Sequence, residues 1–398
     1  MTQQDYKNFE DIAPYPDSIF HEKMKHLLGE QGFEHAVRWV FPDVDYEAFK
    51  QELLKVNDKD TFQQKVMQPF LEMLAAKTTS GLSISGAERL NPHTAYTFIT
   101  NHRDIVLDTS FLNLCFLRAK LPTTEVAIGS NLLVYEWIND LVRLNKSFIV
   151  KRDLPRLKAL EAAKELSAYI HDTVINRNQS VWIAEREGRS KDSSDRAQES
   201  LVKMLGLAGD GNFKDNLMAI NLMPVSISYE YDPNDYLKAR EFLLRKNDPE
   251  FKKSQRDDLF AMETGLMQSK GRVHFTVGFP LNDEIKNLDG TLDKNTLARE
   301  ICHLIDCQIH SGYEIYPINY IAYDLLLHTH EFASHYTREE VDKFKQYIDN
   351  QLKKVDVPEL SADDYDYMKE MMLTMYANPL RNNINVDDTC LSDSYIGN

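Results

Sequence analysis

The protein has 398 residues, of which 42% are hydrophobic and 27% charged, a composition typical of folded globular proteins rather than disordered or fibrous ones. Its 62 acidic side chains outnumber its 46 basic ones, and the net charge of −16 argues against broad electrostatic attachment to nucleic acid. The longest stretch without Asp, Glu, Lys or Arg covers residues 216–229. That is shorter than the ~20 apolar residues of a membrane-spanning helix, so we expect no span and no nucleic-acid partner.

The N-terminus and the cysteines indicate the compartment. The first seventeen residues are acidic and contain no apolar segment of the kind found in signal peptides. Cys115, Cys302, Cys307 and Cys390 do not form a disulfide framework and have no metal-site spacing. We therefore expect a cytoplasmic protein.

Helical periodicity dominates the first part of the chain. In residues 17–77 apolar side chains recur at three- and four-residue spacing, as in Phe20, Met24 and Leu27. We therefore predict a helical N-terminal region over residues 1–80.

From about residue 82, short β-rich segments alternate with helical ones. The predicted strands cover residues 96–100, 125–128, 147–150, 180–184, 222–229 and 273–278. The helices predicted between them cover residues 105–118, 133–143, 154–175 and 195–205. This alternation predicts an α/β domain over residues 81–282, with a mixed, largely parallel sheet flanked by helices. In such sheets, ligands bind at the carboxyl ends of the strands.

After residue 282 the pattern becomes helical again. Helices are predicted at residues 296–309, 338–352 and 362–377, and the acidic stretch 356–370 is most simply a solvated helix face. Residues 283–398 are therefore predicted to form a mainly helical C-terminal region with a frayed tail.

The end of the first predicted strand carries a candidate general base. His102 leaves this strand just before a helix, and carboxylates follow at Asp104 and Asp108. A carboxylate in this position can fix the imidazole tautomer and stabilise the imidazolium that forms when the His takes a proton. The alternative is that His102 and Asp104 merely cap the helix.

A basic segment follows another strand. Between residues 143 and 158 six cations stand against a single acidic residue, Asp153. Lys151 and Arg152 come directly after the strand, so their charges are expected at the same sheet edge as His102. A basic pair in that place suits a phosphate group.

A third strand runs into charged residues around a glycine. Gly188 permits a sharp turn and close approach of a ligand to the backbone. Arg189 and Lys191 are candidates for a phosphate clamp, and Glu187 is a candidate for accepting a hydroxyl hydrogen bond. The alternative is a polar loop with surface ion pairs, which we favour for Glu185 and the residue after it.

Together with the strand at residues 222–229, these segments resemble the motif set of the glycerol-3-phosphate and lysophosphatidate acyltransferase superfamily. That family has a His followed after four residues by an Asp, then Gly-x-Asn-Leu with Phe-Ile-(Arg/Lys)-Arg, then Glu-Gly-x-Arg-Ser, and finally Pro-(Val/Ile)-x-Ile-x-Tyr-Glu. The order and spacing match over residues 101–230, about a third of the chain. The resemblance implies that His102 is the catalytic base. It also implies that the phosphorylated acceptor is bound by Lys151, Arg152, Glu187, Gly188 and Arg189.

Two departures from the family pattern bear on this resemblance. Five residues separate His102 from Asp108, and Leu107 occupies the position where the family has its Asp. Either a one-residue insertion lets Asp108 orient the imidazole or Asp104 substitutes for it, and we favour Asp108. The segment that begins at Glu187 also lacks the residue that the family places between Gly and Arg, which leaves the acceptor's identity open.

The reaction implied is direct transfer of a fatty acyl group from an acyl carrier protein or coenzyme A thioester to a hydroxyl of glycerol 3-phosphate or 1-acylglycerol 3-phosphate, in phospholipid synthesis. It requires no cofactor, and backbone amides at the start of the helix after His102 are expected to meet the oxyanion. Peripheral contact with the inner face of the membrane is a further hypothesis. Two alternatives are an acyltransferase with another acceptor, such as an amino-acid-derived lipid, and a catalytically silent lipid-binding protein.

The histidines at His328, His330 and His335 resemble a zinc site, but the zinc-protease pattern needs two His four residues apart. Here His330 and His335 are five apart, which separates them by about 140° around a helix. We expect packing or surface histidines and no metal.

Overall fold

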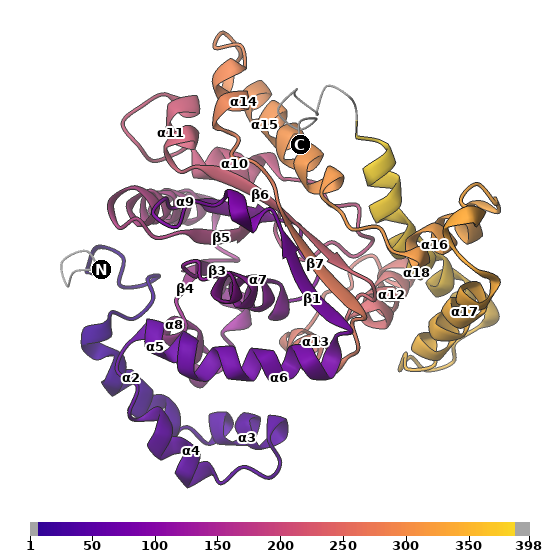
Figure 1. Ribbon diagram of the computed structural model, residues 1–398, viewed down its shortest axis with the longest axis horizontal. Helices are drawn as coiled ribbons and strands as arrows, with labels where there is room; N and C mark the ends of the chain where they lie inside the picture. The colour runs from indigo at the N-terminus through magenta and orange to yellow at the C-terminus, as the bar shows by residue number, and fades with distance from the viewer. Residues whose placement is uncertain (1–6, 387–398) are drawn as a thin grey trace.

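A seven-stranded sheet lies at the centre of the computed structural model, which describes residues 7–386 (Figure 1). The strand order is β1-β7-β6-β2-β5-β3-β4. The strands are β1 (Gly81–Ser85), β2 (Thr97–Thr100), β3 (Glu125–Gly129), β4 (Ser147–Val150), β5 (Val181–Ala184), β6 (Leu222–Tyr229) and β7 (Arg272–Val277). All neighbouring pairs are parallel except β6 with β7, so the prediction of a mixed, largely parallel sheet is confirmed.

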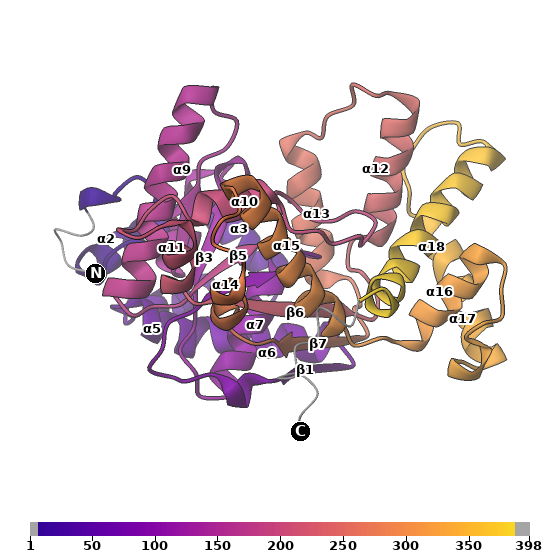
Figure 2. The ribbon, with the colours of Figure 1, turned by 90° about the horizontal axis from the view of Figure 1, so that it is seen from above.

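Helices cover both faces of the sheet (Figure 2). On one face lie α6 (Gln68–Thr78) and α7 (Leu107–Arg118), and on the other α9 (Arg156–His171), α10 (Glu199–Leu205), α11 (Phe213–Ala219) and α15 (Lys294–Ser311). The buried strands divide their side chains between the two layers. In β2, for example, Phe98 packs toward α7 and Ile99 toward α9 and α15. This alternation is the period of two expected of a strand.

The predicted helical N-terminal region is confirmed. It contains α2 (Asp17–Gly29), α3 (Gln31–Val40), α4 (Tyr46–Leu53), α5 (Lys59–Phe62), a π-helical turn (Gln63–Met67) and α6. A separate apolar cluster around Phe20, Met24 and Phe62 holds these helices together. The helix α8 (Glu136–Leu144) joins this cluster through Leu144, which attaches the N-terminal region to the α/β domain.

The C-terminal region is also helical, as predicted. It contains α14 (Asn282–Asn287), α15, α16 (Pro317–Leu327), α17 (Arg338–Leu352) and α18 (Ala362–Ile384). The last three pack with α12 (Asp235–Asn247) around Phe344, Met372 and Tyr376. The predicted frayed tail lies outside the described residues from 387 onward.

Several elements were not predicted from the sequence, chiefly β1, α11, α12, α13 (Gln255–Met267) and α16. β1 is a short edge strand whose residues are all partly or fully exposed, so it has no buried apolar run. The helix α12 buries Asp235, Lys238 and Glu241 along with its apolar side chains, which obscures the helical pattern. The helix α13 buries little beyond Ala261 and Gly265.

No helix within residues 7–386 is long and apolar enough to cross a bilayer. The thiols of Cys115 and Cys302 are free and buried. Cys307 is disulfide-bonded, a pairing that the expectation of no disulfide framework did not include. Cys390 lies outside the described residues.

Candidate active site

The loop between β2 and α7 carries His102, at the sheet edge where the parallel strands β2 to β6 all end. Asn101 anchors this loop. Its buried side chain donates to the carbonyl of Ile227 at 3.0 Å and accepts from the amide of Ile227 at 2.8 Å. Because Ile227 belongs to β6, these two bonds attach the start of the loop to the sheet and fix the position of His102.

His102 is paired with Asp108. Its Nδ1 lies 2.7 Å from Oδ2 of Asp108, a side chain with no exposed surface. An ionised carboxylate only accepts hydrogen bonds, so Nδ1 carries the proton and Nε2 keeps its lone pair. The same Oδ2 accepts from the backbone amides of Arg103 at 2.6 Å and Asp104 at 3.1 Å. The pair is therefore arranged with Nε2 as the basic atom.

Asp104 has the other role that the sequence left open. Its Oδ1 accepts from the amides of Val106 at 2.9 Å and Leu107 at 2.7 Å, so it caps the turn that leads into α7. Leu107 itself is fully buried in the core. Because α7 begins only at Leu107, the additional residue lies in the loop, and Asp108 still reaches the imidazole of His102.

The backbone amides nearest the start of α7, which were predicted to bind the oxyanion, already donate hydrogen bonds within the protein. The amides of residues 103, 104, 106 and 107 all donate to the side chains of Asp104 and Asp108. A different donor lies close to the base. The indole ring of Trp182 stands edge-on to the His102 ring at 5.6 Å between centroids. Its Nε1 is buried and has no hydrogen-bond partner among the described residues.

The two cations that follow β4 are already paired. Lys151 Nζ lies 2.9 Å from Glu165 and 3.5 Å from Asp11. Arg152 Nη1 lies 2.5 Å from Glu187, so two of the predicted substrate-binding residues contact each other. Each of these cations thus has a carboxylate beside it before any ligand binds.

The loop after β5 holds less exposed cations. Gly188 has a φ of +69°, the left-handed conformation that favours glycine, and the loop turns there. Arg189 is 8% exposed, and its Nη1 is buried without a hydrogen-bond partner among the described residues. Lys191 Nζ lies 2.9 Å from Glu241. Burial, together with the cations of Arg189 and Lys253, lowers the pKa of Lys191 to about 7.

The hairpin of α12 and α13 contributes residues to this site that were not predicted from the sequence. Arg245 and Lys253 line the same cavity as His102. The hairpin also contacts the loop that carries His102. Asn234, just before α12, donates to Oδ2 of Asp104 at 3.1 Å. A Cβ placed on Gly265 of α13 would lie 1.9 Å from that oxygen, so glycine is required for this close approach. Gly265, a glycine within a helical segment, is the one feature of the sequence that indicates this close packing.

A buried ionic network lies behind the loop. Arg103 donates to both carboxylate oxygens of Asp195, at 2.7 and 2.6 Å, and the hydroxyl of Tyr313 donates to Asp195 at 2.5 Å. Glu185 is fully buried beside this network, and neither of its oxygens has a hydrogen-bond partner among the described residues. Burial and the neighbouring Asp195 raise the pKa of Glu185 well above its usual range. The expectation of a surface ion pair at Glu185 is therefore wrong.

All of the predicted site residues except the buried Asp108 line one cavity of about 2330 Å³. The part of its lining from α3, α4, α6 and α8, here called the apolar wall, includes Phe33, Val37, Phe49, Phe70, Trp137 and Leu141. The part from the loops after β4 and β5 and from the hairpin, here called the cationic wall, includes Lys151, Arg152, Arg186, Arg189, Lys191, Arg245 and Lys253. His102 belongs to the loop between these walls.

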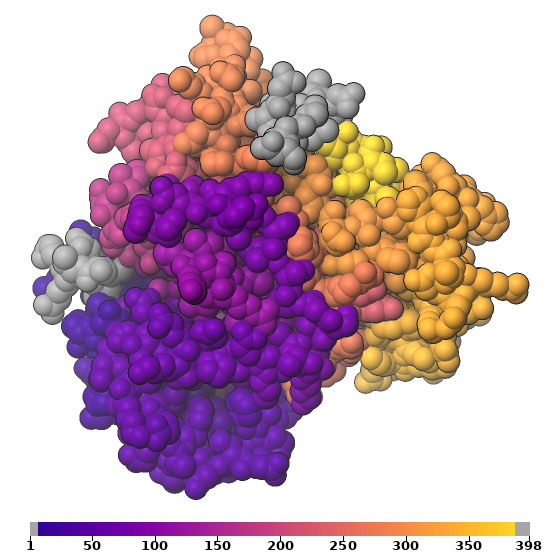
Figure 3. All heavy atoms as spheres, viewed as in Figure 1, coloured from indigo at the N-terminus to yellow at the C-terminus, as the bar shows by residue number. Residues whose placement is uncertain are grey.

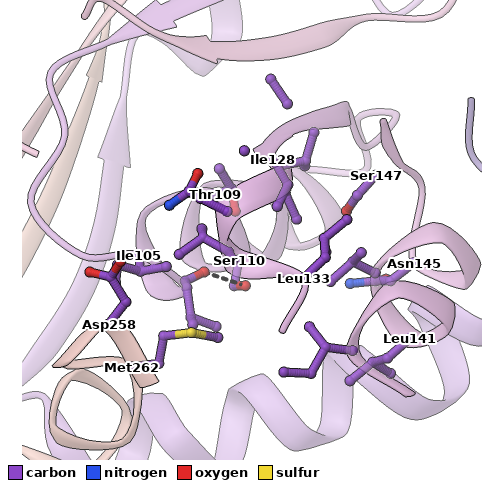
Figure 4. Close-up of a pocket in the computed structure, with 18 of the residues that line it drawn as sticks. Ile105, Thr109, Ser110, Ile128, Leu133, Leu141, Asn145, Ser147, Asp258 and Met262 are labelled. Atoms are coloured by element: carbon purple, nitrogen blue, oxygen red, sulfur yellow. Dashed lines mark hydrogen bonds between the residues drawn. The ribbon is translucent and has the colours of Figure 1, made fainter. Parts of the chain in front are cut away.

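The close-up in Figure 4 shows how the elements meet around this space. Ile105 and Ser110 lie beside Asp258 and Met262 of α13, while Leu141 of α8 lies across from them. In the space-filling view the N-terminal region forms a lobe beneath the sheet domain (Figure 3). The cavity is therefore enclosed by parts of the chain that are far apart in sequence.

The histidines set aside as a zinc site, His328, His330 and His335, are all exposed. The ring of His335 stacks on Tyr320 at 4.2 Å, and His328 ends α16 in a left-handed conformation. Comparison with known proteins adds no relative, because no protein-family model and no curated protein matches the chain.

Proposed function

We propose that this protein is an O-acyltransferase that moves a fatty acyl group from a thioester to a hydroxyl of a phosphorylated glycerol, either glycerol 3-phosphate or its 1-acyl derivative. The observation that carries the proposal is the position of the His102–Asp108 pair. Nδ1 is fixed by a 2.7 Å hydrogen bond, and the ring lines a cavity with one apolar and one cationic wall. An acyl chain suits the first wall and a phosphate group the second.

The chemistry needs one base and no covalent enzyme intermediate. Nε2 of His102 takes the proton of the acceptor hydroxyl while its oxygen attacks the thioester carbonyl. The new C–O bond forms, the C–S bond breaks, and the departing thiolate receives the proton from the imidazolium. Asp108 stabilises that imidazolium through Nδ1. The indole Nε1–H of Trp182, buried and unpartnered among the described residues, is available as a donor near the reacting carbonyl.

The silent lipid-binding alternative depended on Asp108 being displaced from the imidazole. The contact of 2.7 Å removes that reason, because the extra residue is taken up in the loop before α7. A fold that only held lipid would also have no need for a fixed imidazole tautomer, or for an arginine in the cavity lining whose Nη1 has no hydrogen-bond partner among the described residues.

The direct test is a product assay. Purified full-length protein is incubated with acyl carrier protein thioesters or acyl coenzyme A and a panel of acceptors, namely glycerol 3-phosphate, 1-acylglycerol 3-phosphate, glycerol and hydroxylated amino-acid lipids. Mass spectrometry then identifies the acylated product. A phosphorylated glycerol ester that disappears in His102→Ala supports the proposal. Acylation of the amino-acid lipids alone, or no product with any pair, would refute it.

Peripheral contact with the inner face of the membrane belongs to the same proposal, because the product is a lipid. The helix α9 presents Ala159 and Ala163 to the cavity, whereas Leu157 and Leu160 are 80% and 51% exposed. Arg156 begins the same helix, so its first turns combine apolar and basic side chains. In liposome flotation at low salt, Leu157→Glu should release the protein. Leu327→Glu, which changes a 42% exposed leucine on α16, should not.

A further inference from the structure

The α12–α13 hairpin contributes a cluster of charges that lies outside every motif in the sequence. The two helices stand side by side and rise from the body of the molecule (Figure 2). Arg245 lies near the end of α12, and Lys253 lies in the link that precedes α13. Both side chains line the cavity that contains His102.

Three cations converge on one carboxylate of this hairpin. Glu241 lies 2.9 Å from Lys191, 3.0 Å from Arg245 and 3.6 Å from Lys253. The contact with Arg245 meets the distance of an ion pair, but the Oε1 atom involved accepts no hydrogen bond of good geometry. Lys253 also contacts Asp258 at 2.9 Å. The single carboxylate of Glu241 is therefore shared among three cations, with Lys191 the nearest.

Arg189 adds a fourth positive charge to this cluster. It is 8% exposed, and its Nη1 has no hydrogen-bond partner among the described residues. Its charge acts on Lys191, whose pKa it lowers. Lys191, Arg245 and Lys253 thus share the two carboxylates of Glu241 and Asp258, and Arg189 adds its charge beside Lys191. Arg189, Lys191 and Lys253 are at most a quarter exposed, so their charges are weakly screened, whereas Arg245 is 59% exposed at the rim of the cluster.

We propose that Arg189, Lys191, Arg245 and Lys253 form an anion subsite that binds the phosphomonoester dianion of a substrate. The assignment of that dianion to a substrate of acyl transfer rests on the proposed function. A dianion would balance the excess charge. A phosphate group can also accept hydrogen bonds from several elements at once, which one carboxylate cannot do. Lys191 and Arg245 share the one carboxylate of Glu241, and Arg189 Nη1 has no hydrogen-bond partner among the described residues, whereas Lys151 and Arg152 each have a carboxylate partner of their own.

The dianion can come from either substrate, and the ligands of the binding assay separate the two sources. Isothermal titration calorimetry of the full-length protein at pH 8, without an acyl donor, compares inorganic phosphate, glycerol 3-phosphate, glycerol, coenzyme A and dephospho-coenzyme A. Binding of glycerol 3-phosphate but not glycerol assigns the subsite to the acceptor. Binding of coenzyme A but not dephospho-coenzyme A assigns it to the donor. No binding of any phosphate ligand overturns the proposal.

Charge-removing variants test which residues bind. Lys253→Gln and Arg245→Gln should each weaken phosphate binding by about tenfold, the effect of losing one charge-assisted hydrogen bond. The matched control is Lys252→Gln, which removes the same charge from the neighbouring, exposed residue outside the cavity lining and should change nothing. Equal effects of Lys252→Gln and Lys253→Gln would show general electrostatics and overturn the subsite.

Proton uptake gives a second, independent readout. Lys191 is faced by Arg189 of its own loop, by Glu241 and Arg245 of α12, and by Lys253 of the link. A dianion bound among them raises the pKa of Lys191, so the protein takes up a proton at pH 8, where glycerol 3-phosphate is already fully ionised. Titrations in two buffers of different ionisation enthalpy measure this uptake, which Lys191→Gln should abolish. Binding that persists without proton uptake in the unaltered protein would exclude Lys191.

The outcomes are distinguishable from failure of the proposed function. Phosphate binding that responds to Lys253→Gln but occurs without turnover would keep the subsite and refute the acyltransferase. Turnover with a KM for both substrates that Lys253→Gln leaves unchanged would keep the acyltransferase and refute the subsite.

Discussion

The apolar wall and the cationic wall of the cavity offer a ligand different kinds of interaction. The apolar wall comes from helices of the N-terminal region and α8, and it offers aliphatic and aromatic surface. Such surface stabilises a bound apolar group by about 25 cal/mol per Å² of buried area, and this stabilisation does not depend on the orientation of the group. The cationic wall comes from loops and the α12–α13 hairpin, and its side chains are held by specific ion pairs.

This difference indicates where selectivity lies. An apolar wall tolerates ligands that differ by a methylene group, since each contributes only about 0.8 kcal/mol. A cationic wall rejects a ligand without its anion, because Arg189 and Lys191 would then stay in a partly buried place with too little negative charge nearby. We therefore expect broad chain-length tolerance and strict selection for the phosphate.

The largest predicted effect comes from removing the base between the two walls. His102→Ala should lower the turnover number by about 10² to 10⁴, the usual contribution of a general base, with little change in either substrate's affinity. Steady-state kinetics with the acyl thioester and glycerol 3-phosphate measure this. An unchanged turnover number in a folded variant, checked by circular dichroism, would mean that the chemistry lies elsewhere.

The two carboxylates of the loop that carries His102 give a matched pair of substitutions. Asp108→Asn replaces the acceptor for Nδ1 and should lower the turnover number by about 10²-fold or more, because the imidazolium loses its counter-charge. Asp104→Asn keeps a side chain that caps helices well, so turnover should change little. Equal losses in the two variants would show that the whole loop, and not the His102–Asp108 bond, is what matters.

Packing of the α12–α13 hairpin on the loop that carries His102 should be sensitive to a single added methyl group. Gly265→Ala places a Cβ against Asp104, which three hydrogen bonds hold in place, so either the cap or α13 must move. We expect a loss of about 1–3 kcal/mol in the free energy of unfolding, together with reduced turnover. Chemical denaturation measures the first and kinetics the second. Gly290→Ala is the control, because no atom lies within 4 Å of the position of its Cβ.

The pH dependence of phosphate affinity tests the cationic wall. With a pKa of about 7, Lys191 is charged below that pH and increasingly neutral above it in the free protein. Affinity for glycerol 3-phosphate should therefore fall as the pH rises from 7 to 9. If binding is linked to one proton on Lys191, the fall can be at most about tenfold per pH unit. Lys191→Gln should bind more weakly at pH 7 and lose this dependence. A wild-type affinity that is flat over the same range would contradict the role of Lys191.

Site residues that lie close together in the sequence could be predicted, whereas those that come from distant segments could not. The pairing of His102 with a nearby carboxylate could be predicted because both residues lie in one loop at the end of one strand. The sheet was largely predictable for the same reason, since its buried strands are apolar runs, and exposed β1 was the exception. Arg245 and Lys253 could not be predicted. They reach the cavity through a hairpin that buries charged residues and therefore lacks a clear apolar stripe.

The smallest predicted effect comes from the apolar wall. Phe70 lines the cavity and contacts Phe41 at 5.8 Å between ring centroids. Phe70→Ala removes surface from one part of a large wall, so kcat/KM for long acyl chains should fall a few-fold, while that for short chains and the KM for glycerol 3-phosphate stay the same. Phe260→Ala, at a half-exposed phenylalanine of α13 outside the cavity lining, is the control. If Phe70→Ala leaves the dependence of kcat/KM on chain length unaltered, the acyl chain does not contact α6. The assignment of the acyl chain to the apolar wall would then be contradicted.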